Sequence, residues 1–219
     1  ERFESRGLGD VYKRQLLAAA KVGAVVAALS WRLRAGELAH CIALVEPVLI
    51  VVETDLVDAL NEIDVNDKRV LLGESYERNL AQSEEVFPPR RFDVEAGLVI
   101  LYTSGTTGLP KGALISHRAM IARGLVYHLV LEIPDQDNFV AWAPFYHMVS
   151  TDHGLATLLR GGTVWCVDGY QPDRLIELIE NVSISWFVLM PGMVGEFNAE
   201  LRKSLVKPAG LRVIGAMAD

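Results

Sequence analysis

The chain has 219 residues, of which 51% are apolar, and a formal net charge of −7. This length and apolar share predict a folded protein with one large core or two small ones. The charges are scattered and form no basic stripe, so nucleic acid is excluded as the main partner. The two cysteines, Cys41 and Cys166, are far apart and lack CxxC spacing. They are expected to be buried free thiols in a reducing compartment rather than a disulfide or a metal site.

The N-terminal part of the sequence shows no targeting pattern. The longest apolar stretch, residues 16–29, is interrupted by Lys21 and is too short to cross a bilayer. The first fifteen residues are rich in charge and lack the apolar centre of a signal peptide. We therefore expect a cytoplasmic protein with no membrane span. Because residues 1–15 give way abruptly to an apolar sequence, we expect them to be a non-native or disordered leader that packs against nothing.

From residue 16 onward, helical and extended patterns alternate along the chain. In the first half the sequence predicts helices over 16–22, 35–44, 55–63 and 74–82 and strands over 24–29, 48–52 and 69–72. Residues 88–91, Pro-Pro-Arg-Arg, are the one linker-like stretch. In the second half it predicts helices over 117–131, 151–159 and 172–180 and strands over 139–143, 163–167 and 185–189. This alternation predicts an α/β fold with mostly parallel sheets and helices on both faces.

The most informative segment covers residues 101–112, Leu-Tyr-Thr-Ser-Gly-Thr-Thr-Gly-Leu-Pro-Lys-Gly. Apolar residues at 97–101 and 113–115 predict a strand on each side of a polar loop. Such a loop can turn backbone N–H groups and hydroxyls toward an anion, and the lysine adds a positive charge. A polyphosphate is therefore the expected ligand. The residues expected to bind it are Thr103, Ser104, Gly105, Thr106, Thr107, Gly108 and Lys111.

This loop does not match the common P-loop of nucleotide-binding proteins. The P-loop pattern requires Gly before its lysine and Ser or Thr after it, whereas Pro110 precedes Lys111 and Gly112 follows it. Pro110 also lacks an N–H group and fixes φ, which disfavours a helix that begins here with a free donor. The simplest alternative is a hairpin rich in Gly and Thr with an incidental lysine.

The run from Tyr102 to Gly112 resembles the phosphate loop of the adenylate-forming (AMP-binding) superfamily, which includes acyl- and aryl-CoA synthetases, peptide-synthetase adenylation domains and luciferases. Two later segments, Trp142-Ala-Pro-Phe-Tyr-His147 and Ile214-Gly-Ala-Met217, resemble further motifs of this superfamily. The resemblance covers nearly all of residues 16–219. It implies a partial adenylation domain that is truncated at both ends, with the C-terminal domain of the same chain absent.

The resemblance implies a ligase that uses ATP, Mg²⁺ and coenzyme A and acts on a small-molecule carboxylate. The carboxylate attacks the α-phosphorus of ATP, pyrophosphate leaves, and the acyl group then passes to coenzyme A. The residues from Thr103 to Gly108 would bind the β- and γ-phosphates, with Lys111 as a mobile charge and Mg²⁺ shared with the phosphates. Lys111 and His147 are the expected catalytic residues, because His147 would position the carboxylate near the α-phosphate. The residues expected on the substrate and adenine side are Met148, Val149, Gly215, Ala216 and Met217.

Other residues bear on the substrate. Amino-acid-activating members of the superfamily usually have Asp where His147 stands, so an acyl or aryl carboxylate is expected instead. An apolar lining is offered by Met148, Val149, Met190, Pro191 and Met193, although ordinary core packing explains each one as well. Some CoA ligases carry a lysine where this chain has Gly169, which puts the contacts to coenzyme A in doubt.

Several alternatives stay open at this point. His147 is also explained as a packed or surface histidine after a Pro-Phe-Tyr corner. His153 lies six residues after His147, but apart from Asp152 no acidic or cysteine ligands surround these two histidines, so no metal site is expected. Residues 31–42 resemble a stretch upstream of the phosphate loop, but a helix start with Glu37 in its first turn explains them better. For the whole chain, the alternative to a ligase fragment, which alone would be inactive, is a non-catalytic nucleotide- or acyl-binding module.

Overall fold

The computed structural model describes residues 9–61, 63, 65, 69–85, 93–103 and 108–216. The chain divides into two compact units. The larger unit consists of residues 1–18 and 116–219, and the smaller unit of residues 19–115. The helix α1 (Gly9–Val22) begins in the larger unit and ends in the smaller one.

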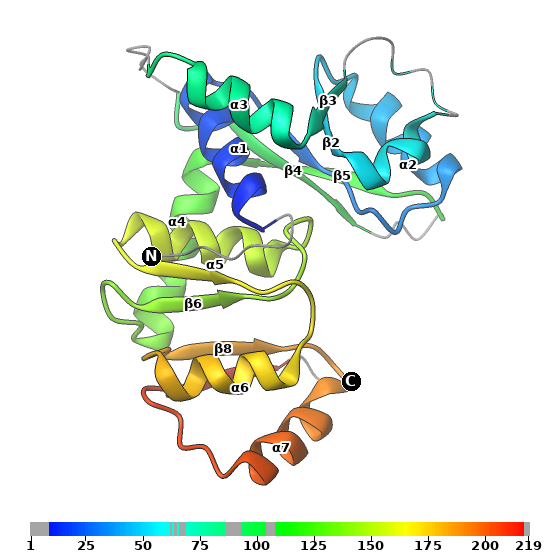
Figure 1. The fold of residues 1–219 in the computed structure, drawn as a ribbon. Coiled ribbons are helices and arrows are strands. Elements are labelled where there is room, and N and C mark those ends of the chain that lie inside the picture. Colours follow the sequence, from blue (N-terminus) through cyan, green and yellow to red (C-terminus); the bar gives the residue numbers. More distant parts are fainter. Residues whose placement is uncertain are drawn as a thin grey trace. The chain divides into compact units, whose positions relative to one another are not determined.

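The smaller unit contains short sheets with helices packed beside them (Figure 1). Its elements are β1 (Val26–Ala28), α2 (Ala35–Val45), β2 (Ile50–Glu53), the 3₁₀ helix η1 (Thr54–Leu60), β3 (Arg69–Leu72), α3 (Glu74–Gln82), β4 (Gly97–Thr103) and β5 (Lys111–Ser116). Strands β2 and β3 are parallel, as are β1 and β4. Leu38 and Ile42 of α2 pack with Ile50 and Leu60 into a buried core.

Strands β4 and β5 flank the predicted phosphate loop. Strand β5 lies on the opposite side of β4 from β1. Gly97, at the start of β4, lies against Leu114, near the end of β5. Thr103, at the end of β4, bonds to the carbonyl of Lys111, at the start of β5. These contacts run in opposite directions along the two strands, so β4 and β5 are antiparallel and their loop-side ends are neighbours.

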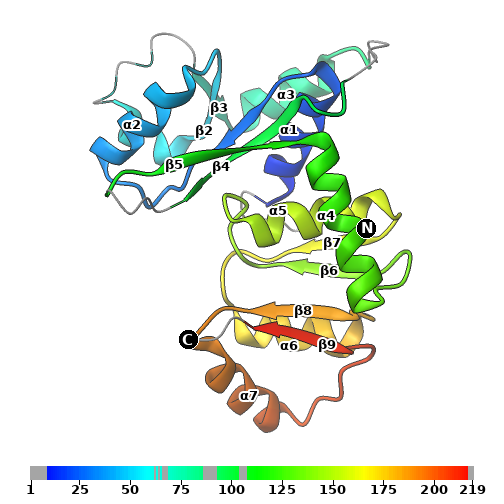
Figure 2. The same cartoon turned by 180° about the vertical axis from the view of Figure 1, so that it is seen from behind.

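The strands of the larger unit form a layer with helices on each side (Figure 2). Its elements after α1 are α4 (His117–Leu131), β6 (Asn138–Ala141), α5 (Met148–Leu159), β7 (Thr163–Cys166), α6 (Pro172–Asn181), β8 (Trp186–Leu189), α7 (Met193–Ser204) and β9 (Val213–Ala216). Strands β6 and β7 form one parallel pair, and β8 and β9 form another. Figure 2 shows the strands in the order β7, β6, β8, β9.

Side chains join β6 to β8 in the middle of this layer. Near the start of both strands, the Asn138 amide donates to the Ser183 carbonyl at 3.0 Å. Near their ends, the buried Trp142 indole N–H donates to the Val188 carbonyl at 2.9 Å. The two strands therefore point the same way, and the carboxyl ends of β6, β8 and β9 lie along one edge of the layer.

Alternate residues of β6 and β8 enter two different cores, because successive side chains of a strand point to opposite faces. Val140 and Phe187 pack with residues of α6 and α7. Phe139 and Trp186 pack with residues at the ends of α4 and α5. Helices thus cover both faces of a parallel layer, which confirms the predicted α/β fold.

Several predicted elements are confirmed within a residue or two, and some are not. The strand at 69–72 and the helices at 74–82 and 117–131 have the predicted bounds. The helix predicted over 55–63 is a 3₁₀ helix over Thr54–Leu60. Helix α7 and strand β9 were not predicted. The linker-like residues 88–91 lie outside the described residues.

The expectation that residues 1–15 pack against nothing is wrong for the part that the structure describes. Residues 9–15 form the first half of α1. The Tyr12 ring stacks on Phe145 with 5.5 Å between centroids, and the buried Lys13 donates to the Cys166 thiol at 3.3 Å. Tyr12 and the buried Leu16 are four residues apart, so they lie on one face of the helix. Residues 1–8 lie outside the described residues, and the domain boundary at residue 16 stays a prediction.

Candidate functional site

The described part of the predicted phosphate loop lies at the adjacent ends of β4 and β5. Thr103 and Lys111 are both exposed, and the Thr103 hydroxyl donates to the Lys111 carbonyl over 3.5 Å. Gly108 has a φ of +90°, and a Cβ there would meet nothing within 4 Å. This left-handed backbone favours glycine. The remaining predicted loop residues, Ser104, Gly105, Thr106 and Thr107, lie outside the described residues.

Helix α2 contacts the chain on both sides of this loop. On the β4 side, the Tyr102 hydroxyl donates to the Cys41 carbonyl at 3.0 Å. Burial raises the pKa of Tyr102 to about 12, so its hydroxyl keeps the proton that it donates. On the β5 side, His40 Nε2 lies 3.1 Å from the Pro110 carbonyl oxygen, which only accepts, so this nitrogen is the N–H donor. No pattern in the sequence indicates either contact.

Residues 31–42 contain the start of α2, as their interpretation as a helix start predicted. The Glu37 carboxylate accepts the Arg34 N–H at 3.0 Å. Glu37 is the third residue of the helix, so its carboxylate reaches back to the N-cap residue in the manner of a capping box. Residues 31–42 therefore position His40 and Cys41 by starting the helix that carries them.

His147 lies in the larger unit, at the point where the chain enters α5. It is the N-cap residue of that helix and its side chain is exposed. Its N–H donates to the Pro144 carbonyl at 3.0 Å, which closes a tight turn. Its ring centroid lies 4.6 Å from that of Tyr146. The structure thus presents the His147 imidazole at the surface of a sharp corner, and a histidine buried in packing is excluded.

Two buried hydroxyls hold this corner. The Ser150 hydroxyl donates to the Ala143 carbonyl, and the Thr151 hydroxyl donates to the Phe145 carbonyl, both at 2.6 Å. The Thr151 hydroxyl also lies 3.3 Å from the His147 carbonyl. Ser150 and Thr151 are only 1% and 2% exposed. Sequence reasoning missed both residues.

The other predicted residues of this unit lie along the carboxyl edge of its layer. The segment from Trp142 to His147 follows β6, and Met190 follows β8. Gly215 and Ala216 lie near the end of β9, opposite Val188 and Leu189 of β8. Figures 1 and 2 show these strand ends at the same side of the layer. Met217 lies outside the described residues.

The predicted apolar lining has mixed surroundings. Val149, Met190 and Met193 pack against the core that contains Trp142. Met148, the first residue of α5, is half-buried, and Pro191 is exposed. Core packing therefore accounts for part of this set, and the Met148 and Pro191 side chains remain partly accessible.

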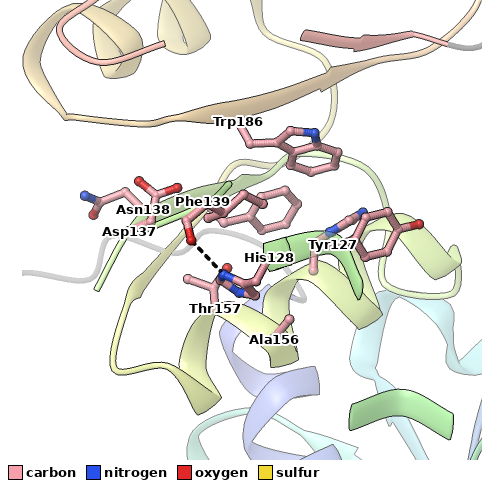
Figure 3. Close-up of a pocket in the computed structure, with 10 residues that line it drawn as sticks. Tyr127, His128, Asp137, Asn138, Phe139, Ala156, Thr157 and Trp186 are labelled. Atoms are coloured by element: carbon pink, nitrogen blue, oxygen red, sulfur yellow. Dashed lines mark hydrogen bonds between the residues drawn. The ribbon is translucent and has the colours of Figure 1, made fainter. Parts of the chain in front are cut away.

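A small cavity of about 10 Å³ lies deeper in the larger unit (Figure 3). The buried His153 lines it, and the rings of Tyr127, Phe139 and Trp186 surround this imidazole with centroids at 4.1, 5.6 and 4.0 Å. Burial lowers the pKa of His153 to about 3, so the imidazole is neutral. The cavity has room for about one water molecule, so it is too small for an organic substrate.

Asp152, beside His153, is fully buried and forms an ion pair with Arg123 of α4. Burial raises the pKa of Asp152, although Arg123 acts in the opposite direction. His153 Nε2 lies 3.8 Å from an Asp152 oxygen. Within the described ranges, no three His, Cys, Asp or Glu side chains gather in a way that would hold a metal ion. Asp152 thus ties α5 to α4.

No helix in the described part of the chain combines the length and the apolar character that a membrane crossing needs. The predicted cytoplasmic location stays a prediction.

Comparison with known proteins gives one consistent family. The family model described as AMP-binding enzyme matches residues 15–218. The chain is 28% identical over 206 residues to the 2-succinylbenzoate–CoA ligase, chloroplastic/peroxisomal, of Arabidopsis thaliana, which covers 85% of this chain and 37% of the relative.

Solved structures share this fold. The N-terminal domain of FACL13 from Mycobacterium tuberculosis, solved with an inhibitor, has a TM-score of 0.81 at 18% identity, over 92% of this chain and 52% of that one. A malonyl-CoA ligase solved with methylmalonyl-CoA and AMP has a TM-score of 0.73 at 25% identity, over 92% of this chain and 42% of that one. The chain thus spans well under half the length of the two named ligases.

Proposed function

Because the chain belongs to the family of AMP-binding enzymes, we propose that the complete protein is an acyl- or aryl-CoA synthetase. In the first step a carboxylate oxygen of the substrate bonds to the α-phosphorus of ATP, and the bond to the leaving pyrophosphate breaks. In the second step the sulfur of coenzyme A bonds to the acyl carbon, and AMP leaves. The protein contributes mainly by holding the reactants in line and by stabilising the negative charge of pyrophosphate.

The observation that carries this proposal is the loop between β4 and β5. Its residue types from Thr103 to Gly108 can donate several hydrogen bonds to phosphate oxygens, and Lys111 at the first position of β5 is exposed. The contacts of α2 at Tyr102 and Pro110 hold the chain on either side of the loop. A loop fixed at both ends loses less conformational entropy when it binds an anion. We assign the β- and γ-phosphates of ATP to this loop.

Mg²⁺ would enter with the nucleotide. The described residues offer no cluster of protein ligands for a metal ion. This fits Mg²⁺, which keeps several waters and is commonly held by substrate phosphates with few protein ligands. When bound, the ion would add positive charge next to the leaving pyrophosphate.

His147 is assigned to the carboxylate. The His147 imidazole is exposed at the N-cap of α5, at the carboxyl edge of parallel strands, where α/β folds commonly bind ligands. The half-buried Met148 and Val149 are next to it in α5 and favour an apolar acyl or aryl group. Gly215 and Ala216 are assigned to the adenine side. Gly169 stands where some CoA ligases have lysine, so the coenzyme A phosphate must find other partners.

A second candidate is a non-catalytic module that binds a nucleotide or an acyl group. Under this alternative, no protein that contains the chain forms acyl-CoA. Under the first proposal the chain alone forms no thioester, and a longer protein that contains it does. Acyl-CoA formed by the chain alone would contradict this part of the proposal.

The test is pyrophosphate release by a full-length protein that contains this chain, assayed with a panel of carboxylic acids. Release should require both ATP and a carboxylate, and Lys111→Ala should slow it by at least tenfold, because a charged hydrogen bond to the leaving group is lost. Lys203→Ala is the matched control, because Lys203 is an exposed lysine of α7 that pairs with Glu200. Equal rates for the two variants would reject the assignment of the loop.

A further inference from the structure

We propose that Ser150 and Thr151 are positioning residues that fix the backbone of residues 143–147 and so set the direction of the His147 imidazole. The inference rests on the proposed role of His147 and names the groups that make this role possible. Neither hydroxyl is expected to touch the substrate, because both residues are almost fully buried.

The first argument is the pattern of hydrogen bonds. The two hydroxyls contact three carbonyl groups of one short segment, those of Ala143, Phe145 and His147. A Ser or Thr hydroxyl inside a helix commonly bonds the carbonyl four residues earlier. Only the longest contact, from Thr151 to His147, has this spacing. The two short bonds leave the helix and reach back around the Pro144 turn.

The second argument is the cost of removing these bonds. The Ala143 and Phe145 residues are buried, so a carbonyl there that loses its donor has little access to replacement water. A buried polar group without a partner costs about 1–3 kcal/mol. The corner would relax to recover a donor, and His147 would move with its own backbone.

The third argument is that the helix carrying the hydroxyls is itself fixed. Asp152 is fully buried next to Thr151 and pairs with Arg123 of α4. Phe145 and Val149 pack in the core formed with β6, β7 and β8. The hydroxyls therefore act from a helix that is anchored to both a neighbouring helix and the strand layer. Such support helps to give the exposed His147 imidazole a defined direction.

The kinetic experiment uses the full-length enzyme and three variants. Thr151→Val removes the hydroxyl at nearly constant volume, and Thr151→Ser retains it. Thr157→Val makes the same change two turns later in α5, at a half-buried position. We expect Thr151→Val to lower kcat/KM for the carboxylate by about tenfold to a hundredfold, as a misplacement of about 1 Å can do. Thr151→Ser should recover most of the activity, and Thr157→Val should keep it.

The decisive comparison repeats Thr151→Val in a His147→Ala background. If Thr151 acts through His147, the second substitution should cause little further loss of kcat/KM, because the group that it positions is gone. A loss of the same size in both backgrounds would overturn the proposal. His147→Ala with unchanged activity would reject the catalytic role of His147, which is a failure of the proposed function.

A structural readout separates the two failures. The His147 ring resonances, identified by their disappearance in His147→Gln, report its surroundings by NMR without any turnover. They should shift in Thr151→Val and stay in place in Thr157→Val. If Thr151→Val does not fold, Ser150→Ala serves in its place and should shift the same resonances. Unchanged His147 resonances in a folded Thr151→Val or Ser150→Ala variant would contradict the positioning role.

Discussion

The phosphate loop of the smaller unit and the His147 corner of the larger unit are built differently. The described loop residues Thr103 and Lys111 are exposed, and the contacts that hold the loop come from α2, outside the motif. At the corner, the buried hydroxyls of Ser150 and Thr151 donate to backbone carbonyls just before His147. The residue types of this loop thus suffice to predict phosphate binding, whereas the supports of the His147 corner are visible only in the packing of the folded chain.

We therefore expect the largest loss of folding stability from substitutions in the buried ion pair that anchors helix α5 beside the His147 corner. Arg123→Met leaves the carboxylate of Asp152, whose side chain is 0% exposed, without its charged partner. Removing one member of a buried ion pair typically costs about 3–5 kcal/mol. We expect a loss near the lower end, about 3 kcal/mol, in the unfolding free energy measured with urea, because Arg123 itself is partly exposed.

The control for this prediction is Arg174→Met in α6. Arg174 also pairs with a carboxylate, that of Glu177, but both side chains are about half exposed. Exposed pairs contribute about 0–1 kcal/mol. A loss of the same size in both variants would show that burial of Asp152 does not decide the effect.

The next effect is a dependence of stability on pH through His153. The folded pKa of about 3 lies below the ordinary value of 6.5, so between these values the unfolded chain binds a proton that the folded chain does not. Acid therefore favours unfolding, and stability falls as the pH drops below about 6.5. The slope is about 1.4 kcal/mol per pH unit, or about 2 kcal/mol between pH 6.5 and 5.

The measurement is urea unfolding at several pH values, compared between the parent protein and His153→Phe, which can occupy the same aromatic surroundings. The variant should lose most of the slope. Asp152 contributes to the pH dependence of stability with the opposite sign, because its raised pKa makes the folded state bind the proton more tightly than the unfolded state does. Retention of the full slope in His153→Phe would assign the acid sensitivity to other groups.

The smallest effect is expected at the loop supports. His40→Ala removes the donor to the Pro110 carbonyl and should cost about 1 kcal/mol of unfolding free energy. Tyr102→Phe removes the other bond to α2 and should act similarly. Both variants should also weaken ATP binding severalfold, because the loop ends gain freedom. Calorimetry that finds unchanged ATP affinity in both would exclude a role for α2 in holding the loop.

Much of the fold follows from the sequence, and the exceptions have physical reasons. The helix at 117–131 starts as predicted because the Ser116 hydroxyl accepts the Ala119 N–H. Helix α7 escaped prediction because Gly195 interrupts its pattern and Phe197 is its one fully buried residue among those described. Strand β9 has only four residues, one of them Gly215, and its register comes from β8.

The residues of the proposed site were predicted from their motifs, and their supports were not predicted. Lys111, His147 and Gly215 belong to patterns of residue types, which are visible in the sequence. The bonds from Ser150 and Thr151 reach back seven and six residues, respectively, around a turn, a spacing that no helical or extended period indicates. The contact between His40 and Pro110 joins residues 70 positions apart, so only the folded chain brings them together.

The central claim is that the loop ending at Lys111 binds the triphosphate of ATP. The most direct test is calorimetry of Mg·ATP and of AMP on the full-length protein and on Lys111→Ala. We predict that the variant binds Mg·ATP about tenfold to a hundredfold more weakly, the equivalent of one charged hydrogen bond, and binds AMP as the parent does. Equal Mg·ATP affinities for the two proteins, or no binding by the parent, would contradict the claim.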